Sequence, residues 1–235
     1  MAIQAEPAGR PQIPLNRERV LQAAVGVADA RGLDALTMRN LAEALGVEAM
    51  SLYYHVANKN AILDGVVDVI MIEIEQAVSS ADAPSPEDDW KSAMRARILA
   101  AREVLLRHPW APNVFDARIS KNPAVLRYFN AVLGLFRRGG FSYDLAHHAL
   151  HALGSRALGF AQELFQPAGN VASGDDAGDE MLARLAPQLP YLVEMMAEIA
   201  HDDPDSTLGW CDDQAEFEFG LDLILDGLEG LRARA

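Results

Sequence analysis

Apolar residues recur every three or four positions along most of the chain, and strict alternation of apolar and polar residues is almost absent. A spacing of three to four residues places side chains on one face of an α-helix, whereas strict alternation is typical of a β-strand. The pattern therefore predicts an all-α protein in which each helix buries one apolar face.

Three short helices are expected before residue 60. Asn16 is a good N-cap for the first helix, which Gly32 ends in the manner of a left-handed cap. Thr37 is the N-cap of a second helix that ends at Gly46, and a third helix of about two turns starts at Glu48. A helix, a glycine turn and another helix in this order predict a helix-turn-helix.

Longer helices are expected in the rest of the chain. A fourth helix over residues 60–78 joins the N-terminal helices to the C-terminal part of the chain, and a short proline-bracketed piece occupies residues 108–115. The other expected helices cover residues 86–107, 123–138, 143–165, 180–200 and 213–232. The predicted organisation is a flexible arm (1–14), a helix-turn-helix domain (15–60) and a helical C-terminal domain (61–235).

The composition is that of a globular protein, with 50% hydrophobic and 23% charged residues. The net charge of −14 argues at first against a nucleic-acid partner. Residues 10–59, however, hold six Arg or Lys against five Asp or Glu, whereas residues 61–235 hold 14 against 28. The N-terminal part is therefore electrostatically distinct from the remainder, which indicates that the two parts of the chain have different functions.

No apolar run reaches the roughly 18 residues of a membrane helix. The first 14 residues lack the apolar core of an export signal. The single cysteine, Cys211, excludes an internal disulfide framework. We therefore expect a cytoplasmic protein with no membrane span.

The segment AMSLYYHVANK (49–59) holds the candidate chemistry. Leu52 and Val56 fit the buried side of a helix-turn-helix, which leaves Tyr53, Tyr54 and His55 over, because neighbouring helical residues point in different directions. In such a motif the N-terminal end of the second helix enters the major groove of DNA. On spacing alone two interpretations stay open: these side chains contact DNA, or the tyrosines cap the edge of the core.

The segment LTMRNLAEALGVEAMSLYYHVANK (36–59) resembles the DNA-binding signature of the TetR (tetracycline repressor) family. RRGGFSYDLAHHALHALGSRALGF (137–160) and FEFGLDLILDGLEG (217–230) resemble the two dimer-forming helices of the tetracycline-repressor subgroup. The resemblance implies a ligand-responsive homodimeric regulator and not an enzyme. It implies most directly a repressor that a small molecule releases from a palindromic double-stranded DNA operator. The alternative is an activator of transcription.

Carried over by position, the resemblance implies that Arg39 and Ser51 approach bases and that the neighbouring polar residues contact the DNA backbone. Ala49 and Met50 stand where the tetracycline repressor has a Gln and a Pro, which implies a different operator. The complete set of implied DNA contacts is Thr37, Arg39, Glu48, Ala49, Met50, Ser51, Tyr53, Tyr54, His55 and Lys59.

The last expected helix carries an apolar seam suited to a partner helix. Its members, at spacings of four and three, are Phe217, Leu221, Ile224, Leu228 and Leu231. The resemblance implies that this helix and the one over 143–165 form a four-helix bundle with a second copy of the chain. The alternative is a core within one chain.

In the tetracycline repressor, the drug and a divalent metal bind between the C-terminal helices. Phe115 stands in place of a metal-binding His and Glu75 in place of a drug-contacting His, while Glu163 matches a further acidic metal-site residue. We therefore expect no metal, no cofactor, and an effector other than a metal–tetracycline complex. The expected pocket is mainly apolar and comprises Trp110, Phe115, Phe129, Phe136, Phe160 and Glu163. The alternative for its aromatic residues is that they belong to the hydrophobic core and bind no ligand.

Two other classes of function compete with this interpretation. A helical enzyme or metal protein would need a ligand set, and His147 and His151, which share a helix face, lack a clear third partner. A small-molecule-binding or interaction protein with a degenerate helix-turn-helix is the second alternative, and a DNA gel shift would distinguish it.

Overall fold

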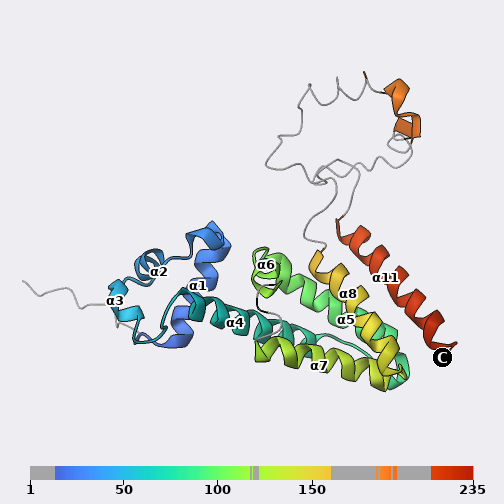
Figure 1. The fold of residues 1–235 in the computed structure, drawn as a ribbon, viewed down its shortest axis with the longest axis horizontal. Coiled ribbons are helices and arrows are strands. Elements are labelled where there is room, and N and C mark those ends of the chain that lie inside the picture. Colours follow the sequence, from blue (N-terminus) through green and yellow to red (C-terminus); the bar gives the residue numbers. More distant parts are fainter. Residues whose placement is uncertain are drawn as a thin grey trace, which may run out of the picture. The chain divides into compact units, whose positions relative to one another are not determined.

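A computed structural model of the chain describes residues 14–116, 118, 122–159, 184, 186–191, 193–194 and 213–234. The described residues are helical and contain no strand, as the periodicity predicts (Figure 1). The chain divides into two compact units, Met1–Pro84 with Ala96–Leu135, and Ser85–Arg95 with Phe136–Ala235. The three helices of the predicted helix-turn-helix domain lie in the first unit, while all but the last residue of the predicted arm falls outside the described residues.

The helices begin and end close to where capping signals place them. They are α1 (Arg17–Arg31), α2 (Met38–Leu45), α3 (Ala49–Leu52), α4 (Lys59–Ser80), α5 (Pro86–Arg107, broken at Asp89), α6 (Ala111–Asp116), α7 (Pro123–Arg138), α8 (Tyr143–Gly159) and α11 (Asp213–Arg232), with 3₁₀ turns η1 (Leu33–Ala35) and η2 (Ala186–Gln188). The predicted bounds of the last helix are confirmed. The predicted end of the 143–165 helix and most of the 180–200 helix lie outside the described residues.

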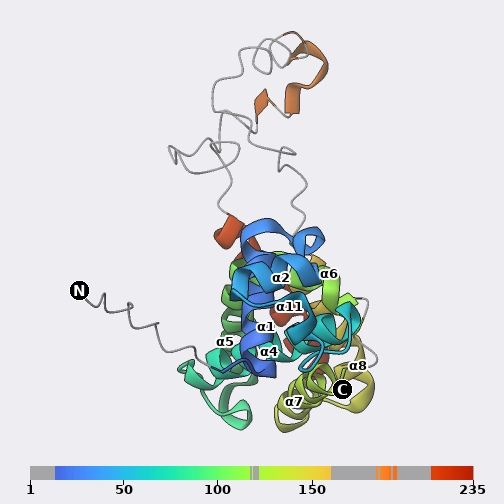
Figure 2. The same cartoon turned by 90° about the vertical axis from the view of Figure 1, so that its left-hand side faces the viewer.

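In the first unit, α1 contacts both α2 and α4 (Figure 2). The Asn16 side chain accepts a hydrogen bond from Arg19 N at 2.8 Å, which confirms the N-cap. Gly32 has a positive φ of 78°, but its ψ of 167° lies outside the left-handed helical region, so the predicted left-handed cap is wrong there. The chain leads instead directly into η1.

The helices α1 and α4 approach each other closely at Gly65. A Cβ atom at this position would lie 2.5 and 2.7 Å from the two δ-carbons of Leu21. Leu21 is itself buried, so a side chain at residue 65 would force the Leu21 side chain or the helices to shift. This glycine therefore fixes how the N-terminal helices sit on the first turns of α4.

Asn122 connects the start of α7 to α4. Its Oδ1 accepts hydrogen bonds from the backbone N–H groups of Ala124 and Val125 at 2.8 and 3.2 Å, which confirms the predicted N-cap. Its Nδ2 donates to Asp68 Oδ1 at 3.0 Å. The predicted end of this helix, beside Gly139, is also confirmed.

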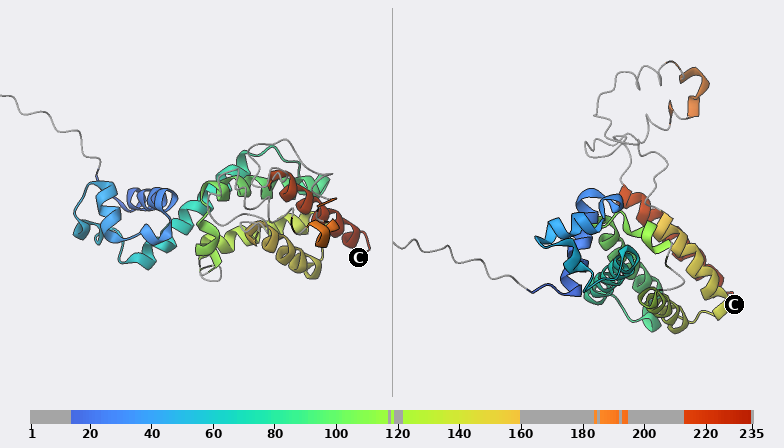
Figure 3. Two further views of the ribbon diagram at one scale, coloured as in Figure 1. Left: turned by 90° about the horizontal axis from the view of Figure 1, so that it is seen from above. Right: turned by 60° about the vertical axis from the view of Figure 1, so that its left-hand side comes forward.

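In the second unit, α8 and α11 lie side by side (Figure 3). Trp90 packs its ring against Phe141, with centroids 4.6 Å apart, and Phe141 packs on Phe136 at 4.9 Å. The Trp90 indole donates to Glu229 Oε2 at 2.6 Å. Arg95 bridges to α11 by donating to Asp222 Oδ1 at 2.8 Å. The hydrogen bonds of Trp90 and Arg95 thus hold the start of α5 against α11, and the aromatic packing holds it against the end of α7 and the turn before α8.

Candidate DNA-binding surface and effector cavity

The helix-turn-helix is built by capping residues at both ends of α2. The Thr37 hydroxyl accepts a hydrogen bond from Asn40 N at 3.1 Å, which confirms the predicted N-cap. Gly46 adopts the left-handed conformation, with φ 66° and ψ 36°, and its N–H bonds to Glu43 O at 3.1 Å. The chain therefore reverses immediately after α2.

The helix α3 is shorter than predicted, with only the four residues Ala49–Leu52 in place of about two turns. The chain continues in a turn, in which Val56 N still bonds to Leu52 O at 2.9 Å. Asn58 then caps α4 by accepting a hydrogen bond from Ala61 N at 2.9 Å. Six residues, 53–58, connect α3 to α4.

Exposure divides this segment into two faces. Leu52 and Val56 are 0% and 3% exposed, whereas Met50, Tyr53 and Tyr54 are 72%, 48% and 89% exposed. The exposure of Tyr54 excludes a place at the edge of the core for this residue, which was the alternative interpretation for the two tyrosines. The buried side chains of Leu52 and Val56 therefore hold the segment on the core, and its aromatic and thioether side chains face the solvent.

The predicted DNA contacts belong to one continuous stretch of α2, α3, the following turn and the first residue of α4. Arg39 and Lys59 are exposed, and Lys59 lies at the N-terminus of α4, where backbone N–H groups favour an anion such as a phosphate. The Ser51 hydroxyl donates to Glu48 O at 2.6 Å, which leaves its lone pairs to accept. The complete set lies at Thr37, Arg39, Glu48, Ala49, Met50, Ser51, Tyr53, Tyr54, His55 and Lys59, and none of these side chains is fully buried.

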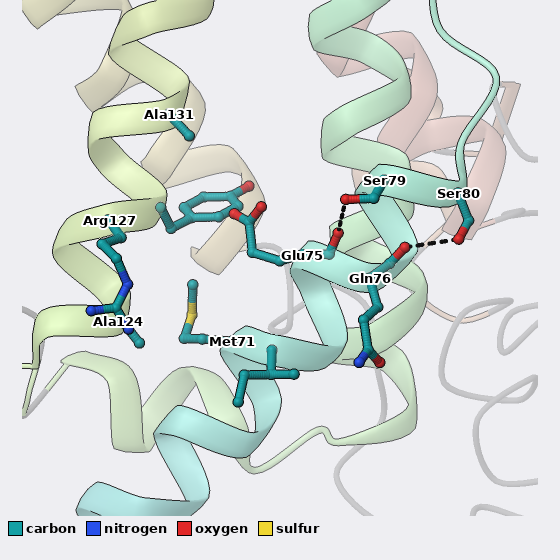
Figure 4. Close-up of a pocket in the computed structure, with 10 residues that line it drawn as sticks. Met71, Glu75, Gln76, Ser79, Ser80, Ala124, Arg127 and Ala131 are labelled. Atoms are coloured by element: carbon teal, nitrogen blue, oxygen red, sulfur yellow. Dashed lines mark hydrogen bonds between the residues drawn. The ribbon is translucent and has the colours of Figure 1, made fainter.

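A cavity of about 550 Å³ lies between α4 and α7 in the first unit (Figure 4). Its volume falls in the range of small-molecule sites, roughly 300–1,000 Å³. The α4 residues Met71, Ile72, Glu75, Gln76, Ser79 and Ser80 face the α7 residues Ala124, Arg127, Tyr128 and Ala131.

Arg97 on α5 supports the wall of this cavity. Its guanidinium donates to Glu75 Oε1 at 2.7 Å and lies over the Tyr128 ring, 4.6 Å from the centroid. Its Nε–H is buried and has no partner among the described residues. Burial raises the pKa of the Tyr128 hydroxyl above its ordinary value.

The predicted pocket residues occupy other places. Trp110 is buried before α6, where its indole donates to Asp29 Oδ1 at 2.6 Å. Phe115 is buried on α6, Phe129 is half-buried on α7, and Phe136 belongs to the aromatic cluster of the second unit. None of these four lines the α4–α7 cavity, and Phe160 and Glu163 lie outside the described residues.

The α8 histidines are exposed, and the rings of His147 and His151 have their centroids 4.7 Å apart. Within the described part of the chain, no group of three or more His, Cys, Asp or Glu side chains is placed to hold a metal ion. No helix among the described residues is long and apolar enough to cross a membrane.

A capped helix-turn-helix with an exposed aromatic face, followed by a larger helical part with a ligand-sized cavity, defines a DNA-binding regulator of transcription. Residues 20–66 match the family described as bacterial regulatory proteins, tetR family, and residues 83–232 match the tetracyclin repressor-like C-terminal domain. The chain belongs to the tetR family.

Among its relatives is the HTH-type transcriptional repressor DrrR1 of Streptomyces coeruleorubidus, which is 31% identical over 97% of this chain and 82% of its own. The solved structure of apo ActR from Streptomyces coelicolor has a TM-score of 0.70 and 27% identity over 94% of this chain and 98% of its own. The same protein in complex with actinorhodin has a TM-score of 0.68 and 28% identity over 94% and 99%. These relatives are transcription regulators and not enzymes, which confirms the class of function predicted from the sequence.

Proposed function

We propose that this protein is a homodimeric repressor that binds a palindromic operator and leaves it when a small molecule binds between the C-terminal helices. One observation carries the DNA-binding part: Leu52 and Val56 are buried, while Met50, Tyr53 and Tyr54 beside them are exposed. A group of large apolar side chains gathered on one surface marks an interaction site, and the groove and backbone of a duplex fit this one.

The geometry of α11 supports a dimer. Phe217 and Leu221 of the predicted seam are fully buried within the chain, and Leu228 is nearly so. A second apolar stripe is exposed, with Phe219 and Leu223, one helical turn apart, at 64% and 58%. A stripe on one helix face is the pattern that a partner helix covers. A dimer also supplies two recognition segments for two half-sites about 34 Å apart.

The response to an effector rests on the cavity and on relatives. The actinorhodin complex shows that ActR binds a small molecule. In this chain, Phe115 and Glu75 replace the histidines expected for a metal–tetracycline complex, so the effector is a different compound. Effector binding favours a dimer whose recognition segments no longer fit the operator. The size of this shift is limited by how much more tightly the effector binds that dimer than the operator-binding dimer.

The test of DNA binding starts with genomic fragments selected by the full-length protein, which define the operator. Tyr54→Ala is then compared with Tyr191→Ala, because both tyrosines are highly exposed, at 89% and 84%, and only the first lies on the proposed surface. We expect Tyr54→Ala to weaken operator binding by about 1 kcal/mol, or several-fold, without changing the circular dichroism spectrum. Equal affinity of both variants in fluorescence anisotropy would refute the assigned surface.

A further inference from the structure

The two serine hydroxyls on the α4 wall of the cavity can accept hydrogen bonds but have no free hydrogen to donate. The Ser79 hydroxyl donates to Glu75 O at 2.7 Å, and the Ser80 hydroxyl donates to Gln76 O at 2.9 Å (Figure 4). A hydroxyl has a single hydrogen and two lone pairs. Because both hydrogens are committed to the helix backbone, both serine oxygens face the cavity only as acceptors.

Glu75 adds a charged acceptor one helical turn before Ser79. Its Oε1 accepts from Arg97 Nη2 at 2.7 Å, and its side chain is 46% exposed. Its Oε2 has no hydrogen-bond partner among the described residues. Residues four apart on a helix lie on the same face, so Glu75 and Ser79 form a pair of acceptors directed at one ligand edge.

The charges around the cavity decide which kind of donor fits this pair. Arg97 already neutralises Glu75, and Arg127 is exposed on the opposite wall, so the three charged groups sum to +1. A cationic amine would enter a site that is already slightly positive. A neutral hydroxyl adds no charge and still gains strength from bonding to an ionised carboxylate.

The remainder of the lining favours a ring system. Met71, Ala124 and Ala131 offer apolar surface, and the small alanines leave room for a flat molecule. Arg97 holds the Tyr128 ring by covering one of its faces. The lining thus combines apolar surface with the acceptors of the α4 wall and the Arg127 cation of the α7 wall.

We propose, on the basis of the proposed function, that the effector is a neutral hydroxylated aromatic compound whose hydroxyl groups donate to Glu75 and Ser79. Arg97 is a positioning residue, since it fixes the Glu75 carboxylate and does not line the cavity. The compound's ring system lies on the apolar part of the lining.

The ligand class is tested with three probes of one shape. 1,3-Dihydroxynaphthalene carries two hydroxyl donors about 5 Å apart, close to the spacing of side chains one helical turn apart. 1,3-Dimethoxynaphthalene has no donor, and 1-naphthylmethylammonium carries a cation. Calorimetry with the full-length protein should show the methoxy and ammonium probes each bound about tenfold more weakly than the dihydroxy probe. A methoxy or ammonium probe that binds as tightly as the dihydroxy probe overturns the proposal.

Variants connect the difference to the two acceptors. Ser79→Ala removes one acceptor and keeps a good helix former, and Glu75→Gln removes the charge. Each should weaken the dihydroxy probe several-fold and leave the methoxy probe unchanged. Glu103→Gln, an exposed carboxylate of α5 outside the cavity lining, is the control. If both cavity variants bind the dihydroxy probe as tightly as the wild-type protein, the proposal is overturned. If Glu75→Gln does not fold, unchanged affinity in Ser79→Ala is sufficient to overturn it.

Operator binding without any probe separates this proposal from the proposed function. A protein that binds its operator but does not prefer the dihydroxy probe refutes the ligand class and leaves the repressor intact. A protein that shows the predicted probe preference but binds no operator refutes the repressor and leaves the ligand class intact.

Discussion

Asp29 on α1 joins the DNA-binding helices to the segment between α5 and α6, and its removal should be costly. It accepts hydrogen bonds from Trp110 Nε1 at 2.6 Å and from His108 Nδ1 at 2.8 Å. The other ring nitrogen of His108 lies 3.2 Å from Glu73 Oε2 on α4. Both His108 and Trp110 are buried, at 7% exposure each. One carboxylate therefore satisfies two donors that have little access to water.

The variant Asp29→Ala leaves both donors without this acceptor. An orphaned buried donor costs about 1–3 kcal/mol, which gives about 2–6 kcal/mol for two. The Asp29 side chain is 31% exposed, so water entering the space of the lost carboxylate recovers part of that cost. We expect the free energy of unfolding to fall by about 2–4 kcal/mol.

Urea unfolding followed by circular dichroism measures this loss, with Asp34→Ala as the control because Asp34 is an exposed aspartate of η1. A double-mutant cycle with Trp110→Phe isolates the indole bond. The cycle should return a coupling energy of about 1 kcal/mol or more. A loss below about 0.5 kcal/mol for Asp29→Ala, or strictly additive losses in the cycle, would refute the reasoning.

Three other predictions concern helix packing, acid stability and assembly. Gly65→Ala should lower the free energy of unfolding by about 1–3 kcal/mol, because the new Cβ meets the buried Leu21. Gly26→Ala, with open space around the residue, should be neutral or stabilising. Urea titrations that show the reverse order of stability would contradict the close approach of α1 and α4. Burial works to raise the pKa of Glu73, but hydrogen bonds from Arg107 and His108 outweigh it and leave the pKa below the ordinary value, so this carboxylate stabilises the fold above about pH 4.3 and the contribution is lost as the pH falls through its lowered pKa. Glu73→Gln should flatten the acid limb of the stability profile, and an unchanged limb would argue against it. Leu223→Asp should shift sedimentation from dimer to monomer while Leu106→Asp, at a comparably exposed leucine on α5, should not; dimers in both variants would exclude the α11 stripe as the interface.

Local signals made most of the fold predictable. Asn16, Thr37 and Asn122 each carry a side-chain acceptor at the first turn of a helix, and each forms the predicted cap. Gly46 adopts the left-handed conformation that only glycine enters without strain. These outcomes depend on three or four consecutive residues, so the sequence specifies them without knowledge of distant contacts.

The failures share the opposite cause. Gly32 has the expected positive φ, but its ψ of 167° leads the chain into η1, and α3 ends after four residues, about one turn earlier than expected. The α4–α7 cavity requires Glu75 and Tyr128, more than 50 residues apart, to meet across Arg97. The spacing of Glu75 and Ser79 marks one helix face and is a local signal of this wall. Trp110, Phe115, Phe129 and Phe136 do not line this cavity, and their role in binding the effector stays a prediction.

In the segment after Gly46, residues close together in the chain are buried or exposed in turn. Leu52 and Val56 are buried and hold the segment on the core, whereas the side chains of Met50 and Tyr54 are mostly exposed. On the proposed DNA-binding surface, exchange of these outward side chains is expected to alter which DNA sequence is favoured, at almost no cost to the free energy of folding. A regulator built in this way can acquire new target sites through a few surface substitutions while its fold stays the same.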